Sequence, residues 1–509
     1  MSGSSAFPPK LFSAAPSRGL LLGLLVLTLL RLWAAAVIPL TEDEAYYRLW
    51  SLQPQFGYFD HPPMIAWWIA LGRGLAGDTP LGVRLIPVLG SLVTSLAVFD
   101  LGLRLGWSRA IAERASLWCN ATLLIGVGAI LAVPDAATVP FWTLTLCALA
   151  RTGIRRPVAW WAAAGAAAGL ACLSKYSALF LAPGVLLWLA MTPGGLKRLR
   201  GPGPWIAAAI AAAIFSLNMA WNAEHHWLTF DKQFGRVAPG RWAPQYLLEL
   251  AVGQALLLNP AITVFVVRAL GLRSAQGGPS LRLPLATAAP FAGYLVLHAF
   301  HDRVQAHWPV PLYPAFALCA AVAADSALWG EGPRPWLSAL RAIAAPLGLA
   351  LSALILLHLA LPLTDIAGAG DPAQAVRGWP PFADQIEGER LRAGAGWIGV
   401  VSYGLDGELA DQAQIRAPIV ELFERARYPK ADASWRADLS LPGLVIDLRR
   451  RIDPARLGQC FAQVAEIGPI FRDQGLSADS QYVAFRVSGP KVDVRDAGCP
   501  SPAGPLDHR

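Results

Sequence analysis

Charged residues are scarce in this chain. Only 15% of its 509 residues are Asp, Glu, Lys or Arg, whereas 55% are hydrophobic. A soluble globular protein carries about 25% charged residues, so this chain has too few of them to cover a water-exposed surface. The composition excludes a soluble enzyme, a nucleic-acid-binding module and a disordered scaffold, and it indicates a polytopic membrane protein.

The apolar runs predict about eleven membrane spans of roughly 20 residues each, some of them short. The first run, Gly19–Leu40, follows Lys10 and Arg18 and is expected to be retained as a signal-anchor. The other predicted spans are Pro80–Leu105, Ala110–Val133, Ala136–Ala150, Val158–Leu173, Ser177–Met191, Trp205–Trp221, Tyr246–Val267, Leu283–Phe300, Trp308–Ala324 and Ala342–Leu361.

The formal net charge of +8 comes from short basic clusters between these spans. If the N-terminus is cytoplasmic, every cytoplasmic connection is basic and nearly free of acids, as the positive-inside rule requires. The sequence therefore predicts a multi-pass protein of the bacterial inner membrane with a periplasmic C-terminal segment. The basic connections contain Arg104 and Arg109; Arg151, Arg155 and Arg156; Lys197, Arg198 and Arg200; Arg268, Arg273 and Arg282; and Arg334 and Arg341.

The composition changes after Leu361, where the chain becomes polar. We therefore predict a transmembrane catalytic domain over residues 1–362 and a small α/β periplasmic domain over residues 363–509. Two cysteines of that domain, Cys460 and Cys499, would lie in an oxidising compartment, either as a disulfide or as two free thiols. Predicted strands are Trp397–Tyr403, Leu444–Leu448 and Tyr482–Val487, and predicted helices are Ala410–Ala426 and Pro454–Ile467.

The chemically informative residues fall in the predicted external connections. The first of these packs acids and aromatics into about 20 residues and fixes its second half with two prolines. Its acids are either ordinary solvated loop residues or part of a catalytic site, and we favour the site because stacking aromatics accompany them. The candidates in this loop are Asp43, Glu44, Tyr46, Tyr58, Asp60 and His61.

Later connections supply further acids, cations and aromatics. Asp135 lies at a predicted helix N-terminus, where it is a helix cap, a functional acid or both. Lys175 lies on the external side against the charge rule and next to a tyrosine, which favours a phosphate partner over snorkelling of the side chain to the membrane surface. The remaining candidates for substrate binding are His225, His226, Arg236, Arg303, His307 and Trp308, and Lys232, Arg236 and Arg241 form either a basic acceptor patch or a solvated surface.

These motifs resemble those of bacterial glycosyltransferase family 39, the relatives of protein O-mannosyltransferases and of the lipid A aminoarabinose transferase. The resemblance rests on the loop with Asp43-Glu44-Ala45-Tyr46-Tyr47 and Tyr58-Phe59-Asp60-His61-Pro62-Pro63, and on Pro134-Asp135-Ala136, Leu173-Ser174-Lys175-Tyr176 and His307-Trp308-Pro309. It covers about the first 330 residues. The family implies a GT-C fold and the inverting transfer of a sugar from a polyprenyl-phosphate carrier.

The resemblance also implies roles for individual residues. Asp43 matches the family's general base, Asp135 matches a second acid near the acceptor path, and Lys175 matches a phosphate-binding lysine. The histidines at 225 and 226 lie where some relatives bind a metal, so a divalent metal ion is left open as a cofactor. The implied partners are a polyprenyl-phosphate sugar, the bilayer, and a lipid, glycan or protein acceptor. The alternative function is a multi-span transporter or flippase of a lipid-linked sugar, but the chain shows no internal repeat of the kind transporters carry.

Overall fold

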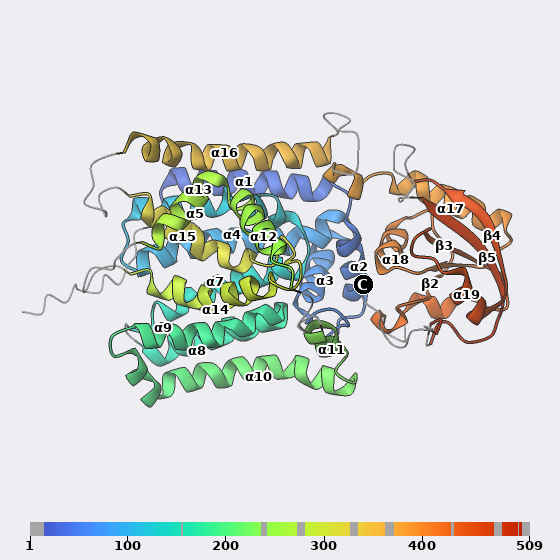
Figure 1. Ribbon diagram of the computed structural model, residues 1–509, viewed down its shortest axis with the longest axis horizontal. Helices are drawn as coiled ribbons and strands as arrows, with labels where there is room; N and C mark the ends of the chain where they lie inside the picture. The colour runs from blue at the N-terminus through green and yellow to red at the C-terminus, as the bar shows by residue number, and fades with distance from the viewer. Residues whose placement is uncertain are drawn as a thin grey trace, which may run out of the picture. The chain divides into compact units, whose positions relative to one another are not determined.

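The computed structural model describes residues 15–153, 156–235, 242–271, 280–325, 334–361, 371–428, 432–472, 481–496 and 498–500 (Figure 1). The chain divides into two compact units. The first consists of Met1–Ala36 and His61–Leu356, and the second of Val37–Asp60 and Leu357–Arg509. The first predicted external loop, which the sequence assigned to the transmembrane domain, thus groups with the C-terminal segment.

The first unit is built from helices. Its α-helices are α1 (Arg18–Val37), α3 (Met64–Ala76), α4 (Pro80–Arg104), α5 (Arg109–Asn120), α6 (Leu123–Gly126), α7 (Pro134–Leu149), α8 (Pro157–Ser174), α9 (Leu181–Met191), α10 (Pro202–Glu224), α11 (Leu228–Phe234), α12 (Gln245–Leu257), α13 (Pro260–Ala269), α14 (Arg282–His298), α15 (Tyr313–Ala323) and α16 (Pro335–Ala360). Its 3-10 helices are η1 (Gly128–Ile130), η2 (Tyr176–Phe180), η3 (Gly195–Arg200) and η5 (Val310–Leu312).

Within the described residues, five helices are long and apolar enough to cross a membrane: α1, α4, α8, α10 and α16. The number rises to seven if each of two sharply bent helix pairs counts as one span. Several shorter apolar helices accompany them, so the total of about eleven spans stays a prediction.

The bends lie inside predicted continuous spans. The sequence predicted one helix through Ala110–Val133, but α5 ends at Asn120, and the segment Leu123–Ile130 meets α7 at an angle of 120°. The predicted span Tyr246–Val267 breaks between α12 and α13 at an angle of 111°. There Asn259 has φ +75° and is followed by a proline, and both features end a helix.

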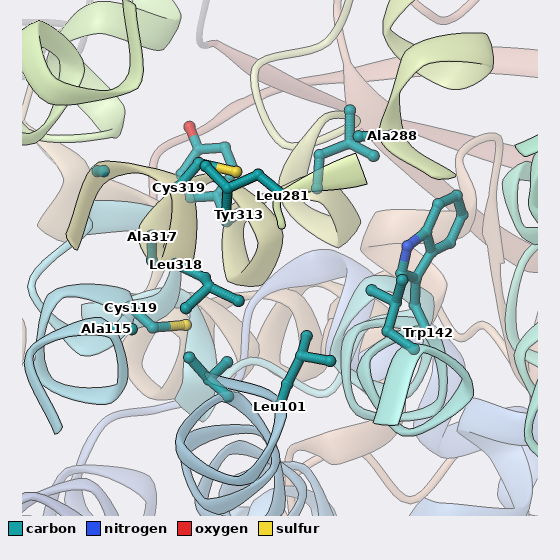
Figure 2. Packing of buried hydrophobic residues seen from close by; sticks show 14 of the residues in the cluster. Leu101, Ala115, Cys119, Trp142, Leu281, Ala288, Tyr313, Ala317, Leu318 and Cys319 are labelled. Carbon is teal, nitrogen blue, oxygen red and sulfur yellow. The ribbon is translucent and has the colours of Figure 1, made fainter. Parts of the chain in front are cut away.

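Helices from distant parts of the first unit meet in one apolar core. Figure 2 shows Leu101 of α4, Cys119 of α5, Trp142 of α7 and Tyr313 of α15 in this cluster. Trp142 and Tyr313 are completely buried. The core therefore holds together the helices whose ends carry the candidate residues described below.

The second unit contains a five-stranded sheet with the strand order β2-β1-β3-β5-β4. Strands β2, β1 and β3 run parallel, whereas β5 pairs antiparallel with both β3 and β4. Its elements are α2 (Glu42–Leu52), η7 (Pro372–Ala375), α17 (Trp379–Arg392), β1 (Trp397–Val400), α18 (Tyr403–Asp411), β2 (Ile419–Glu421), η8 (Arg425–Arg427), η9 (Ala433–Arg436), β3 (Gly443–Leu448), α19 (Pro454–Cys460), β4 (Phe461–Ile470) and β5 (Tyr482–Pro490).

Both faces of the sheet are covered. On one face, Phe382 of α17 and Leu409 of α18 pack against Ile446. On the other face, Leu457 of α19 packs with Phe485. Burial on both faces explains why the central strands β1 and β3 are apolar except for Asp447 near the end of β3.

Two helices predicted for this segment are wrong in extent. The helix predicted over Ala410–Ala426 is replaced by α18, which ends at Asp411, and by strand β2 after Pro418. The helix predicted over Pro454–Ile467 ends at Cys460, where β4 begins. Both errors arise because pairing with a neighbouring strand satisfies the backbone of these segments, and a single sequence does not reveal that pairing.

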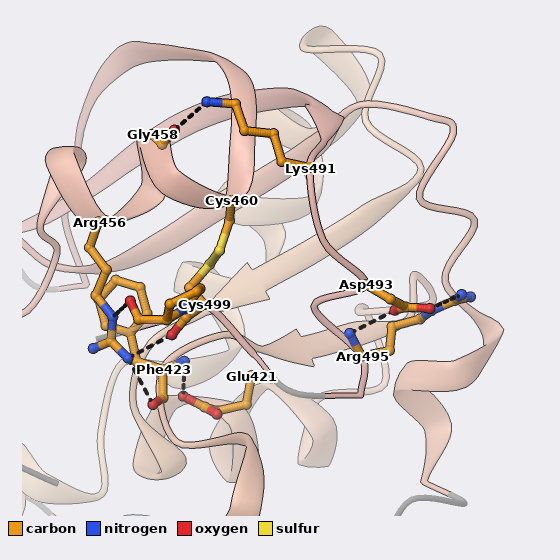
Figure 3. The surroundings of a disulfide bond; sticks show 10 residues. Glu421, Phe423, Arg456, Gly458, Cys460, Lys491, Asp493, Arg495 and Cys499 are labelled. Carbon is orange, nitrogen blue, oxygen red and sulfur yellow. Dashed lines mark hydrogen bonds and ion pairs between the residues drawn. A yellow bond between two sulfur atoms is a disulfide. The ribbon is translucent and has the colours of Figure 1, made fainter. Parts of the chain in front are cut away.

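Cys460 and Cys499 are joined by a disulfide, with their Cα atoms 5.6 Å apart (Figure 3). Of the two states that the sequence left open, the structure thus has the disulfide. Arg456 lies beside it, and its Nη2 donates to the carbonyl oxygens of Cys499 at 2.9 Å and Phe423 at 3.1 Å. The disulfide fixes the end of the described chain to the start of β4.

Helix α18 approaches α2 closely through two glycines. A Cβ atom on Gly407 would lie 2.6 Å from the backbone nitrogen of Tyr46, and a Cβ atom on Gly404 would overlap the side chain of Glu42. Neither glycine has a positive φ, so backbone conformation does not require glycine here. The lack of space for a side chain requires it. The contact fixes α2, with its acidic first turn, to the sheet unit.

Replacing Gly407 by Ala should destabilise the protein, because overpacking a close backbone contact costs about 1–3 kcal/mol. Thermal unfolding of the purified full-length protein, followed by intrinsic fluorescence, should show a melting temperature lowered by several degrees. Gly458→Ala is the matched control, since a Cβ atom there meets nothing within 4 Å. Equal melting temperatures for the two variants would contradict this account of the α2–α18 contact.

Candidate functional site

The first candidate cluster, in the helical unit, consists of Asp135, Lys175 and His307. Lys175 Nζ lies 2.8 Å from both carboxylate oxygens of Asp135. Nε2 of His307 lies 3.7 Å from Oδ2 of Asp135. The lysine and aspartate side chains are 13% and 8% exposed, whereas that of His307 is 53% exposed. Removing both charges of an ion pair from water costs free energy, and such pairs among apolar helices are usually kept because they have a function. We therefore treat this pair as a candidate functional site.

Local sequence places the two paired residues at helix ends. Val133 has an extended backbone and Pro134 occupies the first helical position, so α7 begins there and Asp135 falls in its first turn. The positive end of the helix dipole favours a carboxylate at that position. Lys175 follows the last residue of α8 with an extended backbone, which directs the chain into η2.

Hydrogen bonds hold the chain immediately after Lys175. The hydroxyl of Tyr176 donates to Oδ1 of Asn218 at 2.7 Å and accepts from Nδ2 of Asn222 at 3.2 Å. Both asparagines are completely buried in α10. The Tyr176 ring also packs against Phe230, with centroids 4.8 Å apart. Lys175 is therefore presented from a fixed backbone.

A row of aromatic rings ends beside His307. Centroid distances are 5.1 Å from Phe180 to Tyr294, 5.8 Å from Tyr294 to His298, and 5.4 Å from His298 to Trp308. Trp308 is next to His307 in the chain, so the row of aromatic rings ends beside the charged cluster. Aromatic rings of this kind stack against sugar rings or isoprenoid units.

The other candidates in this unit make their contacts elsewhere. His225 stacks on Trp221, with centroids 4.0 Å apart, and its Nδ1 lies 2.8 Å from the Trp221 carbonyl oxygen. His226 is exposed and has φ +54°. Arg303 is exposed and pairs with Glu249 at 2.8 Å. None of these contacts involves Asp135 or Lys175, and Arg236, predicted to bind substrate, lies outside the described residues.

Metal binding at His225 and His226 stays an expectation. The described part of the chain contains no group of three or more His, Cys, Asp or Glu side chains arranged to hold a metal ion. The stacking of His225 on Trp221 and its contact with a carbonyl oxygen give that ring a local structural role.

The second candidate cluster lies in the sheet unit and contains the acids of the first predicted external loop. The hydroxyl of Tyr403 donates to Oδ1 of Asp43 at 3.1 Å. Asp60 accepts hydrogen bonds at Oδ2 from the Tyr46 hydroxyl, at 2.9 Å, and from Nη1 of Arg427. Asp60 is only 8% exposed. Asp43 and Asp60 are therefore both fixed by residues of the C-terminal segment.

Glu44, predicted to be catalytic, closes a capping box at the start of α2. Its Oε2 accepts from the backbone nitrogen of Thr41 at 3.0 Å, and its own backbone nitrogen donates to Thr41 Oγ1 at 3.4 Å. Its side chain is fully buried. This geometry stabilises the helix that carries Asp43, and it gives Glu44 a structural role in addition to any catalytic one.

The loop aromatics predicted to bind substrate are packed against other side chains. Tyr58 stacks face to face on Trp50 at 4.4 Å, and its hydroxyl accepts from the backbone nitrogen of Gln55 at 2.9 Å. Tyr46 is 1% exposed and contacts the Tyr403 ring at 4.8 Å. Contact of Tyr46 or Tyr58 with a substrate stays a prediction, as does a substrate contact of His61, which is half-buried at the start of the helical unit.

Arg427 and Tyr403 are site residues that the sequence analysis missed. The Arg427 guanidinium bonds Oε2 of Glu424 through Nε at 2.7 Å, and it lies 4.6 Å from the Tyr403 ring centroid and 4.9 Å from that of Phe59. Its partner Asp60 is 367 positions away in the sequence. No local pattern signals such a pairing, because it depends on how the chain folds.

Arg427→Gln should strongly destabilise the sheet unit, because it leaves the buried Asp60 carboxylate without its cation. Breaking a buried ion pair in this way costs about 3–5 kcal/mol. Thermal unfolding and limited proteolysis of the full-length protein check this. Arg449→Gln is the control, since its pair with Glu466 is 49% and 44% exposed and is worth about 1 kcal/mol or less. Equal losses in the two variants would exclude a special role for Arg427.

Glu408 of α18 is a buried acid facing other acids. It is 1% exposed, and its Oε1 accepts no hydrogen bond from the described residues. Burial, followed by the negative charges of Glu42 and Asp411, raises the pKa of Glu408 to about 9, although the Arg472 cation lowers it. The folded protein therefore holds a proton on Glu408 at neutral pH.

This proton makes the stability of the fold depend on pH. Between the ordinary glutamate pKa of 4.5 and about 9, the folded state binds more protons than the unfolded state, so stability falls as pH rises through that window. Glu408→Gln should flatten the decline in melting temperature measured between these pH values. Glu466→Gln, at an exposed acid, should leave the decline unchanged. The same slope in wild type and Glu408→Gln would contradict the assignment.

Comparisons with known proteins find relatives of part of this chain. The family of dolichyl-phosphate-mannose-protein mannosyltransferases matches residues 60–221, a segment that contains Asp135 and Lys175. Lipid A galacturonosyltransferase RgtD of Rhizobium johnstonii (strain DSM 114642 / LMG 32736 / 3841) is 30% identical over 213 residues, which are 40% of this chain and 44% of RgtD. The match thus spans less than half the length of that relative.

Solved structures extend the likeness to most of the chain. ArnT from Cupriavidus metallidurans in the apo state has a TM-score of 0.62 at 16% identity, covering 93% of this chain and 99% of ArnT. ArnT bound to undecaprenyl phosphate gives the same score and identity, over 93% of this chain and 100% of ArnT. At this identity the likeness shows the fold. Together with the matched family segment, it agrees with the resemblance predicted from the sequence: the chain has the fold of ArnT, and residues 60–221 match the mannosyltransferase family.

Proposed function

We propose that this protein is an inverting membrane glycosyltransferase that moves a sugar from a polyprenyl-phosphate carrier to an acceptor on the periplasmic face. The observation that carries the proposal is the Lys175–Asp135 ion pair with His307 beside it, held at the ends of apolar helices. The GT-C fold and the undecaprenyl phosphate bound by ArnT support this class of donor.

Lys175 is proposed to hold the carrier phosphate. Transfer breaks the bond between the anomeric carbon and the phosphate oxygen, and negative charge grows on the departing phosphate. An ammonium group fixed in a poorly hydrated site stabilises that charge more than water does. The half-exposed His307 adds a second cation when it is protonated. The aromatic row that ends at Trp308 is proposed to contact the sugar or the first isoprene units.

Asp43 is proposed as the general base. It accepts the proton of the acceptor hydroxyl while that oxygen attacks the anomeric carbon. A phosphate leaving group needs little help from a general acid, so one base and electrostatic stabilisation suffice. The hydrogen bond from the Tyr403 hydroxyl orients the Asp43 carboxylate.

Lipid A is the acceptor that we propose to test first, with a uronic acid as the sugar. The support is the 30% identity to a protein named lipid A galacturonosyltransferase, over a segment that spans 44% of it. An anionic acceptor of this kind also suits the exposed cation Arg303 in the helical unit.

The test is turnover by the purified full-length protein in lipid nanodiscs, supplied with undecaprenyl-phosphate-linked galacturonic acid and lipid A. Mass spectrometry measures release of undecaprenyl phosphate and the mass gained by lipid A. Asp43→Asn and Lys175→Gln should each lower turnover by about a hundredfold or more. Lys197→Gln, an exposed cation in η3, should have no effect.

A further variant separates chemistry from stability. Lys175→Gln leaves Asp135 without its partner, whereas the double variant Lys175→Gln/Asp135→Asn removes both charges and should restore stability without restoring turnover. Recovery of turnover in the double variant would exclude phosphate binding by Lys175, and full activity of Asp43→Asn would exclude Asp43 as the base. Movement of the lipid-linked sugar between leaflets, with no acceptor modified, would support a flippase instead.

A further inference from the structure

A cavity of about 630 Å³ opens between α1, α5 and α16 of the helical unit. These helices come from three separate parts of the chain (Figure 1). The described residues that line the cavity are Gly19, Leu20, Gly23, Glu113, Arg114, Leu117, Trp118, Ser338, Arg341, Ala342, Ala345 and Pro346. None of them belongs to either candidate cluster described above.

The lining of the cavity changes from polar to apolar along α5 and α16. Helices α1 and α16 contribute residues from their N-terminal halves, whereas α5, which begins at Arg109, contributes residues from Glu113 to Trp118. On α5 and α16 the lining begins with charged or polar residues, and about one turn further on it consists of Leu117, Trp118 and Ala345. Helix α1 contributes only Gly19, Leu20 and Gly23. The cavity thus has a polar mouth and an apolar interior. The charge pattern of the sequence predicts that the mouth lies at the cytoplasmic surface.

Cations dominate the mouth. Nη1 of Arg114 donates to the Ala321 carbonyl oxygen at 2.9 Å, and Nη1 of Arg341 donates to the Ala324 carbonyl oxygen at 3.4 Å. Because these carbonyl groups are neutral, the two hydrogen bonds do not cancel the guanidinium charges. The two arginines repel each other, and Asp325 is the acid that interacts with Arg114.

The acid at the mouth is already paired. Oε1 of Glu113 accepts from Nε of Arg109 at 2.9 Å and from the backbone nitrogen of Ser17 at 2.8 Å. It is therefore engaged by residues other than Arg114 and Arg341. The first turns of α1 and α16, which line the cavity, add the positive partial charge of their N-terminal ends.

We propose that this cavity binds an anionic phospholipid of the cytoplasmic leaflet. Its phosphate lies between Arg114 and Arg341, and one acyl chain enters the apolar part beside Leu117, Trp118 and Ala345. The charge at the mouth matches a phosphodiester, and the apolar interior matches a hydrocarbon chain. A soluble phosphate would satisfy only the mouth, and a neutral lipid only the interior.

The experiment is native mass spectrometry of the full-length protein in detergent, titrated separately with phosphatidylglycerol and phosphatidylcholine. The wild type should hold one phosphatidylglycerol molecule in preference to phosphatidylcholine. The double variant Arg114→Gln/Arg341→Gln should bind phosphatidylglycerol at least about tenfold more weakly, because each cation near a membrane surface contributes to anionic-lipid binding. Glycerol phosphate added to the wild type should not displace the lipid.

Two further variants make the test specific. Gly23→Leu should weaken lipid binding while the protein stays folded, because a Cβ atom at Gly23 meets nothing within 4 Å and the larger side chain fills the cavity. Lys197→Gln/Arg200→Gln removes the same charge from exposed positions of η3 and should bind lipid like the wild type.

Three results would overturn the proposal. The first is equal binding of the two lipids by the wild type, and the second is unchanged phosphatidylglycerol binding by Arg114→Gln/Arg341→Gln. The third is a loss of binding by Lys197→Gln/Arg200→Gln as large as that of Arg114→Gln/Arg341→Gln, which would mean general attraction to a basic surface.

Discussion

The sheet unit depends on the buried ion pair between Asp60 and Arg427. A carboxylate in that position is tolerable only if a cation stays beside it, so the loop that carries Asp60 and the C-terminal segment that carries Arg427 must fold together. The pair also organises its surroundings, because Asp60 receives the Tyr46 hydroxyl and Arg427 lies against Tyr403. Tyr403 in turn donates to Asp43. The proposed base is thus held by the framework of the sheet unit and does not sit in a loosely solvated loop.

The sequence predicted the helical unit well where apolar runs are bounded by strong end signals. Pro80 and Pro157 each begin a helix that the run of apolar residues indicated. The prediction failed where tertiary contacts end a helix inside a run of apolar residues. Asn120, at the end of α5, donates to Ser95 Oγ and accepts from Arg31 inside the apolar bundle, and no local pattern distinguishes that asparagine from one in a continuous helix. Strand β4 was predicted as helix for the same reason, since its partner β5 lies elsewhere in the chain.

Prediction of the candidate site shows a similar division. Charged residues between apolar runs are conspicuous, so Asp135, Lys175 and His307 could be picked from their local motifs, and the structure brings these three together. The hydrogen-bond partners of Asp43 and Asp60 could not be predicted from the sequence. Tyr403 and Arg427 are 360 and 367 positions away from them. The structural role of Glu44 could have been predicted from the local sequence. Threonine followed three positions later by glutamate is the pattern of a capping box, and it should temper a catalytic reading of any acid in that position.

The pairing of Asp135 with Lys175 restricts how an anion binds. Lys175 already directs its ammonium group at both Asp135 oxygens, 2.8 Å away, so the pair is close to neutral before a donor arrives. A phosphate placed beside it would gain one cation and meet one carboxylate, which makes the attraction small. The cluster then favours the phosphate only if another positive charge joins it. His307 is placed to supply that charge, since it is within 3.7 Å of Asp135 and exposed enough to exchange a proton with solvent. In the proposed mechanism Lys175 therefore holds the departing phosphate together with a protonated His307, and the negative charge of Asp135 limits how strongly the cluster attracts it.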